Sequence, residues 1–204
     1  LLDALTPAQQ ADFDALAARA RHALSQNARA LPDEALHRDV LHPSLASPLV
    51  ELAALCEVAL SARFALGPRP TLPRGAVVAG KRHDFLPDLR EVEGLLGLRA
   101  EVAVLDAPEP IRVWPDTPMM VALGEGTHAQ RRVWVGQALG ALRLGLGRLF
   151  ALDPSRALEL LGVVSVLLAP TPGDDPVERT LVDALPPRTA DRVKAVIADV
   201  AGAA

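Results

Sequence analysis

The stretch RRVWVGQALGALRLGLGRLF, residues 131–150, decides how the fold is built. Its apolar residues return at helical spacing and form one stripe, made of Leu139, Leu142, Leu146 and Leu149. Thr127 stands just before the stretch and is a suitable N-cap residue. The sequence therefore predicts one long, central helix from about Thr127 to Phe150.

Small residues give this predicted helix a narrow side. Gly136, Gly140 and Ala141 fall together, and each interior glycine costs about 1 kcal/mol relative to alanine. We therefore expect a neighbouring helix or sheet to approach the backbone closely there.

The periodicity changes in the residues before the helix. AEVAVLD (100–106), PIRVW (110–114) and TPMMVALGEG (117–126) are short β-like runs, and prolines separate them. One further short strand is possible at 77–78, and a helix is expected from about Asp88. The pattern favours a small antiparallel sheet of three or four strands packed on the long helix.

Helical patterns flank this centre on both sides. Capping residues and apolar spacing predict helices near 6–27, 31–42 and 47–66 before it, and near 153–168, 175–184 and 186–202 after it. The fold class is α+β and predominantly helical. We expect an N-terminal helical segment (1–66), which resembles the tail of a helical-repeat array, a Pro/Gly-rich connector (67–87) and a second domain (88–204).

Composition excludes several functional classes. Net charge is −4 and aromatic residues are 3%, with no basic block carrying interleaved aromatics, so nucleic acid is not an expected partner. The longest apolar helix carries four arginines, which argues against a membrane span. Cys56 is the only cysteine, and its apolar surroundings predict a buried thiol. No export signal is visible, so a cytoplasmic location is expected. The chain begins with Leu1 rather than methionine, so we expect a fragment of a longer protein.

A phrase in the centre of the chain carries a family resemblance. Val102, Val104, Asp106 and Pro108 match a V-x-V-x-D-x-P pattern, and a second strand ends at Leu123-Gly124 before the long helix. Over roughly residues 88–170 this order resembles the core of gluzincin-type metallopeptidases of the CAAX-protease and heat-shock-protease kind. Degenerate domains of this kind occur near the ends of large bacterial helical-repeat proteins.

The resemblance fails at the residues that carry the chemistry. The positions that match His-Glu-Leu-Gly-His run from Gln137 to Ala141, and only the leucine and the glycine are kept. In that family two histidines one turn apart bind zinc, and the glutamate activates a water molecule. Here Gln137, Ala138 and Ala141 stand at those places, so the resemblance implies a vestigial site without zinc and without peptidase activity.

Other chemical residues form weaker patterns. His37 and His42 are five residues apart at a helix end, which does not suit a metal pair. His83 with Asp84, and His128 with Glu125, are the nearest material for a general base, but no nucleophile elbow accompanies them. The acids of PGDDP (172–176) and the GEGT loop (124–127) are better explained as helix-capping sequences.

These patterns predict no catalytic, metal or cofactor site. They favour a non-catalytic structural or protein-interaction domain, a pseudoenzyme in a larger bacterial protein or assembly. Its partner would be another protein or other domains of the same chain. Trp114 is the residue that we expect to contact a partner if it is exposed. Two alternatives stay open: a small-molecule or peptide-binding module that uses the vacated cleft beside Gln137, and a hydrolase with an unrecognised active site.

Overall fold

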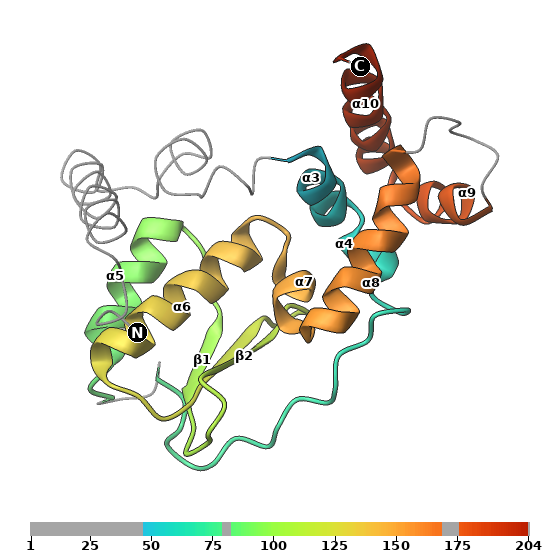
Figure 1. The fold of residues 1–204 in the computed structure, drawn as a ribbon. Helices are drawn as coiled ribbons and strands as arrows, with labels where there is room; N and C mark the ends of the chain where they lie inside the picture. The colour runs from blue at the N-terminus through green and yellow to red at the C-terminus, as the bar shows by residue number, and fades with distance from the viewer. Residues whose placement is uncertain (1–46, 79–82, 169–175, 204) are drawn as a thin grey trace, which may run out of the picture.

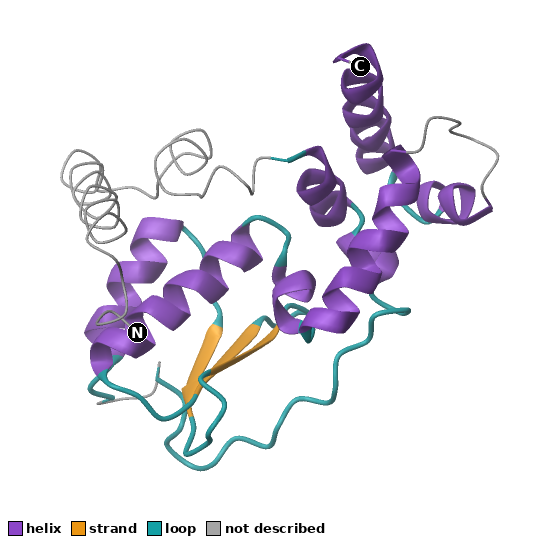
Figure 2. Ribbon diagram, viewed as in Figure 1, coloured by secondary structure: helices purple, strands orange, loops and turns teal. Residues whose placement is uncertain are grey.

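The structure is a computed structural model that describes residues 47–78, 83–168 and 176–203. The described residues are mostly helical with one small sheet (Figures 1 and 2), which confirms the predicted α+β, predominantly helical class. The helices predicted before residue 47 lie outside the described residues, as do His22, His37, His42 and most of the PGDDP loop. The helices are α3 (Pro48–Leu55), α4 (Glu57–Leu60), α5 (Leu86–Leu96), α6 (His128–Arg143), α7 (Gly147–Ala151), α8 (Pro154–Ser165), a 3₁₀ turn (Val166–Leu168), α9 (Pro176–Asp183) and α10 (Pro187–Ala203).

The sheet has three strands, β1 (Glu101–Val104), β2 (Ile111–Trp114) and β3 (Met120–Leu123), in the order β1-β3-β2. β2 pairs with β3 in antiparallel fashion, but β1 and β3 are parallel. The prediction of an antiparallel sheet was therefore wrong for one of the two strand pairs. The physical reason is the strand order: β3 lies between β1 and β2. The chain reverses direction between β1 and β2 and again between β2 and β3, so β3 runs in the same direction as β1. Val77 forms an antiparallel bridge to Ala103 along the edge of β1 that does not pair with β3.

One face of the sheet packs against α5 and α6, as Figure 1 shows. Side chains alternate between the faces of a strand, so Val102, Val113 and Val121 point to this inner face. They form the sheet cluster with residues from both helices and the segment before α5. Its buried members are Val78, Phe85, Leu89, Val92, Leu96, Val102, Val113, Val121, Leu123, Val135, Ala138 and Leu139.

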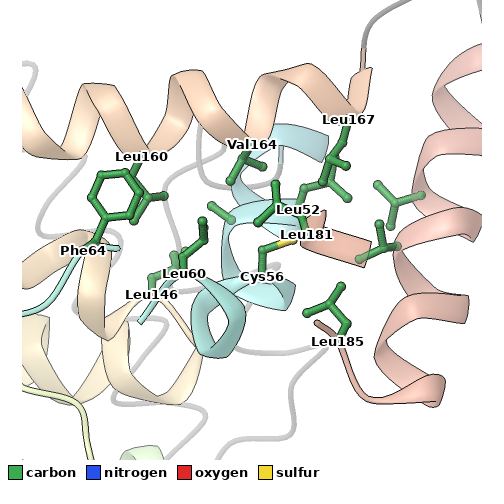
Figure 3. Close-up of a cluster of buried hydrophobic side chains, with 13 residues drawn as sticks. Leu52, Cys56, Leu60, Phe64, Leu146, Leu160, Val164, Leu167, Leu181 and Leu185 are labelled. Carbon is green, nitrogen blue, oxygen red and sulfur yellow. The ribbon is translucent and has the colours of Figure 1, made fainter. Parts of the chain in front are cut away.

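A second group of buried residues, the helical cluster, joins α3 and α4 to helices that follow much later in the chain (Figure 3). Cys56 lies at its centre, and burial raises the pKa of its thiol to about 11. The predicted buried thiol is therefore confirmed. The buried members of the cluster are Leu52, Ala53, Cys56, Leu60, Phe64, Leu146, Leu160, Val164, Leu167, Leu181, Leu185, Val193 and Val196.

α6 begins where the sequence predicts and ends earlier. The Thr127 side chain accepts from the Gln130 N–H at 3.3 Å, and the Gln130 side chain accepts from the Thr127 N–H at 2.9 Å, which makes a capping box. The helix ends at Arg143, because Gly145 takes a left-handed φ of 71° and the Leu146 N–H donates to Ala141 O at 2.8 Å. This is the hydrogen bond of a Schellman cap. The single helix predicted to Phe150 is thus two helices, α6 and α7.

The glycines of α6 do not have the packing role that we expected. A Cβ atom built on Gly136 or on Gly140 meets no heavy atom of the described residues within 4 Å. Close contact occurs after the helix break instead, where a Cβ on Gly147 would lie 2.7 Å from Leu142 and 2.8 Å from Pro115. The expected close approach at Gly136 and Gly140 was therefore wrong.

We expect Gly136→Ala and Gly140→Ala to raise the free energy of unfolding by about 1 kcal/mol each, because alanine restricts the unfolded chain and favours helix. Chemical denaturation of the single and double variants measures this. Gly145→Ala is the matched control. The backbone of Gly145 is left-handed and disfavours a side chain, so this variant should lower the free energy of unfolding by about 1 kcal/mol. A loss of stability at Gly136 or Gly140 would mean that another part of the protein packs there.

Candidate functional site

The positions that match the zinc-binding motif occupy one turn of α6 but face different surroundings. Gln137 is exposed to solvent. Ala138 is fully buried in the sheet cluster. Ala141 is partly buried against the helical cluster. The turn therefore contributes methyl groups to two hydrophobic clusters and one amide to the surface.

The side chains of this turn do not fit a zinc ion. Zinc in proteins takes cysteine, histidine and carboxylate ligands, whereas the turn offers one neutral amide and two methyl groups. Within the described ranges, no group of three or more His, Cys, Asp or Glu side chains is placed to hold a metal ion.

The residue that follows the turn, Leu142, lies beside α7. This short helix packs against β2, and Gly147 at its start lies against Pro115 and Leu142. A helix that covers an edge strand prevents other chains from pairing with it. Four pockets in the described part of the molecule have linings that do not include Gln137. On the inner side of the turn, Ala138 and Leu139 are 0% exposed and pack in the sheet cluster.

The first candidate base, His83, serves the local backbone. Its Nδ1 atom accepts a hydrogen bond from the Phe85 N–H at 3.1 Å, immediately before α5. Asp84 is exposed beside it. The Nδ1 atom is therefore occupied by a local backbone hydrogen bond two residues along the chain, which gives His83 a structural explanation.

The second candidate pair, His128 and Glu125, is divided between two partners. His128 Nδ1 lies 3.5 Å from Asp88 Oδ2, and its ring meets the Phe85 ring edge-on at 6.0 Å between centroids. Glu125 hydrogen-bonds instead to Asp106, and this contact raises the pKa of the Glu125 carboxyl. The two side chains therefore do not form the dyad that a hydrolase would need.

Trp114 is buried, with 4% of its surface exposed. Its indole Nε1–H donates to Gly67 O at 3.1 Å, and the Arg112 guanidinium lies 5.9 Å from the ring centroid. Gly67 belongs to the extended segment that follows α4. Because this segment covers the indole, Trp114 does not present the exposed surface on which its predicted partner contact depended.

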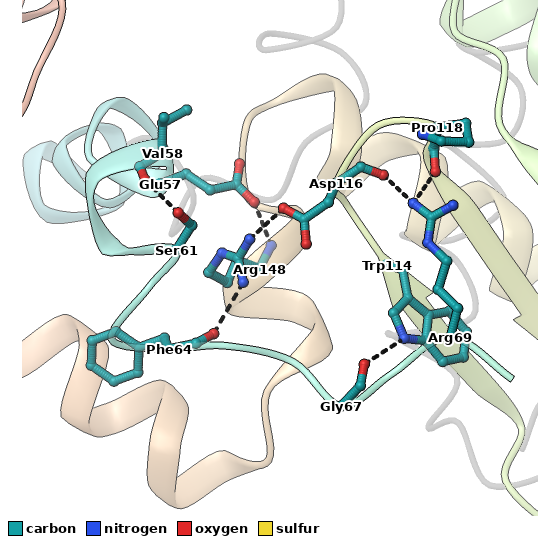
Figure 4. Close-up of polar contacts among 10 residues, drawn as sticks. All are labelled: Glu57, Val58, Ser61, Phe64, Gly67, Arg69, Trp114, Asp116, Pro118 and Arg148. Atoms are coloured by element: carbon teal, nitrogen blue, oxygen red, sulfur yellow. Dashed lines mark hydrogen bonds and ion pairs between the residues drawn. The ribbon is translucent and has the colours of Figure 1, made fainter.

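A polar cluster around Arg148 was missed in the sequence and stands out in the structure (Figure 4). Arg148 in α7 is only 3% exposed. Its NH2 group donates to Asp116 Oδ1 at 2.6 Å and its NH1 group to Phe64 O at 3.0 Å. The Arg148 backbone N–H donates to Glu57 Oε1 at 2.6 Å. The Arg148 side chain thus ties α7 to the start of the extended segment and to the turn between β2 and β3, and its backbone N–H ties α7 to α4.

The Glu57 carboxyl of this cluster is partly buried, and its burial changes its pKa. Desolvation raises its pKa above the ordinary value, and the Asp116 charge raises it further. The hydrogen bond from the Arg148 backbone N–H and the Arg148 charge act in the opposite direction. Burial is the largest of these effects, so Glu57 is held in the fold at an electrostatic cost that Arg148 reduces.

Two global findings complete the description. No helix in the described part of the chain combines the length and the apolar content needed to cross a bilayer. Comparisons of the chain with protein-family models, with curated proteins and with solved structures found no match.

Proposed function

We propose that this chain is a non-catalytic structural or protein-interaction domain, built on a metallopeptidase-like core without a zinc site. The order α5, β1, β2, β3, α6 supports this proposal, because it places a helix and a small sheet before the helix that would carry the motif. The burial of Ala138 is the main support for this proposal. The position at which a metallopeptidase needs its general base is 0% exposed and is part of the hydrophobic core.

The surroundings of the turn favour this function over the two alternatives. A hydrolase needs titratable groups that converge in a cleft, and His83 and His128 have separate structural partners. A binding module that uses the vacated cleft needs open space on the inner side of the turn, and Ala138 and Leu139 there are fully buried. We propose a cytoplasmic location, and as partner another protein or another domain of the same polypeptide within a larger assembly.

The test combines a hydrolysis assay with crosslinking in intact cells. The purified chain, supplied with Zn²⁺, is expected to hydrolyse a mixed peptide substrate no faster than buffer does. The whole sequence contains only two lysines, Lys81 and Lys194, so a carboxyl-selective crosslinker reports contacts better than an amine-selective one. Crosslinks from residues 47–203 to another polypeptide or another domain are expected.

The two readouts can contradict the proposal separately. Hydrolysis that disappears in His83→Ala or His128→Ala would establish the enzyme alternative, and Gln137→Ala serves as the matched control at the exposed turn. Crosslinks confined to residues 47–203 would contradict the interaction function.

A further inference from the structure

The outer face of the sheet, opposite α5 and α6, is covered by an extended strap. We define the strap as residues 65–75, which follow Phe64 and contain Gly67, three prolines and Gly75. Figure 1 shows it running along the sheet side of the molecule without helix or strand. Its ends are fixed, because Phe64 is buried in the helical cluster and Ala76 O accepts from the Val104 N–H at 2.8 Å.

Beneath the strap lies a strip of apolar side chains. Trp114, Met120 and Ala122 share the outer face of β2 and β3 and are each less than 5% exposed, at 4%, 2% and 4%. Leu72 of the strap and Leu105 of the β1–β2 loop pack against them. The strap thus provides part of the cover that keeps this strip from water.

The strap itself buries little surface, and near its start Arg156 NH1 donates to Ala65 O at 3.2 Å. None of residues 65–75 is buried, and an extended proline-rich chain has no hydrogen-bond ladder of its own. Trp114 Nε1–H donates to Gly67 O, and Arg69 NH2 donates to Asp116 O and to Pro118 O (Figure 4). Segments with little buried apolar surface open at a lower free energy than the core, so the strap can leave while the clusters persist.

The surface that the strap covers has the features of a peptide-binding groove. It offers two carbonyl oxygens for an arginine, an indole N–H for a backbone carbonyl, and an apolar strip for an aliphatic side chain. A pocket of about 190 Å³ lies alongside, between Pro70 and the outer-face residues Trp114 and Ala122. Extended proline-rich segments bind aromatic grooves at low entropic cost because their conformation is preformed.

We propose that the strap is the internal occupant of a peptide groove, and that an extended, proline-containing segment of a partner protein displaces it. The partner segment carries an arginine at the place of Arg69 and an aliphatic residue at the place of Leu72. This inference rests on the proposed interaction function and gives it a surface and a partner chemistry. The buried Trp114 then has a role: it is presented only when the strap has left.

The experiment uses a fluorescent peptide with the sequence of residues 65–75, titrated into the full chain and followed by anisotropy. Arg69→Ala weakens the strap but leaves the acceptors Asp116 O and Pro118 O in the groove. The peptide should bind this variant at least tenfold more tightly than the unaltered chain, and acrylamide should quench indole fluorescence more strongly. Arg74→Ala is the matched control, because it removes an exposed arginine of the same strap.

Further arms keep the outcome decisive. Leu72→Ala removes the apolar contact of the strap but leaves the outer-face strip intact, and it should give a similar gain, so the test does not depend on one variant. A control peptide with R69A and L72D should bind neither chain. Equal binding to the Arg69→Ala and Arg74→Ala chains, or unchanged quenching, would overturn the proposal. Crosslinking does not depend on the strap. An interaction domain that uses another surface would therefore fail the peptide-binding test and still give crosslinks to its partner.

Discussion

Replacing Arg148 with methionine is expected to lower the free energy of unfolding by about 2 kcal/mol at pH 7, because it removes the guanidinium that donates to the buried Phe64 carbonyl and pairs with Asp116, which is itself 65% exposed. Methionine keeps most of the apolar stem, so the loss reports the guanidinium rather than a cavity. The Phe64 carbonyl loses its donor, and Glu57 loses the nearest positive charge. Urea denaturation followed by circular dichroism measures the change.

The same variant should show a pH dependence that comes from Glu57. Burial raises the pKa of Glu57 in the fold, so the folded chain binds this proton more tightly than the unfolded chain does. Stability is therefore lost as the pH rises from the ordinary glutamate value through the folded pKa. Without the Arg148 charge this pKa rises further, so the deficit of Arg148→Met should be larger at pH 7 than at pH 4.5.

Arg192→Met is the matched control for Arg148→Met. Arg192 also pairs with a glutamate, Glu51 at 2.9 Å, but its side chain is 66% exposed. Exposed ion pairs contribute less than about 1 kcal/mol, so this variant should unfold close to the unaltered chain. If Arg148→Met lost no more stability than Arg192→Met at either pH, the Arg148 guanidinium would not hold α7 to Phe64 and to the β2–β3 turn.

Short-range features of this fold were predictable because one side chain bonds a nearby backbone group. Thr127 was expected to cap a helix, and its side chain accepts an N–H group in the first turn, as do the side chains of Ser47 and Asp153 at the starts of α3 and α8. The break after Arg143 had a signal in Gly145. The leucine spacing continues through it, however, so the periodicity was extended into α7.

Long-range features left no comparable signal. The position of β3 between β1 and β2 depends on which strands meet after collapse, and the strand sequences allow either order. The partners of Arg148 are 32, 84 and 91 residues away in the chain, and its neighbours in the sequence are apolar. The cover over Trp114 likewise comes from Gly67, 47 residues earlier. Burial of these polar groups was therefore visible only in three dimensions.

Ala138→Glu restores the residue that a metallopeptidase would carry and is expected to destabilise the protein by at least about 4 kcal/mol at pH 7. The new carboxylate would stand among Val113, Val121 and Val135, at a position that is 0% exposed. Its added volume also has to be accommodated in a packed core. Burial raises the pKa of such a group, so the loss should be smaller at pH 5 than at pH 7.

Gln137→Glu is the matched control, because it places the same carboxylate one residue earlier on the exposed side of α6. It should change the free energy of unfolding by no more than about 0.5 kcal/mol. Both variants are compared by urea denaturation at the two pH values. If Ala138→Glu were as stable as Gln137→Glu, the turn would face water, as a catalytic helix must. The proposal that position 138 belongs to the hydrophobic core would then fail. A solvent-accessible position could hold a catalytic glutamate after a single substitution.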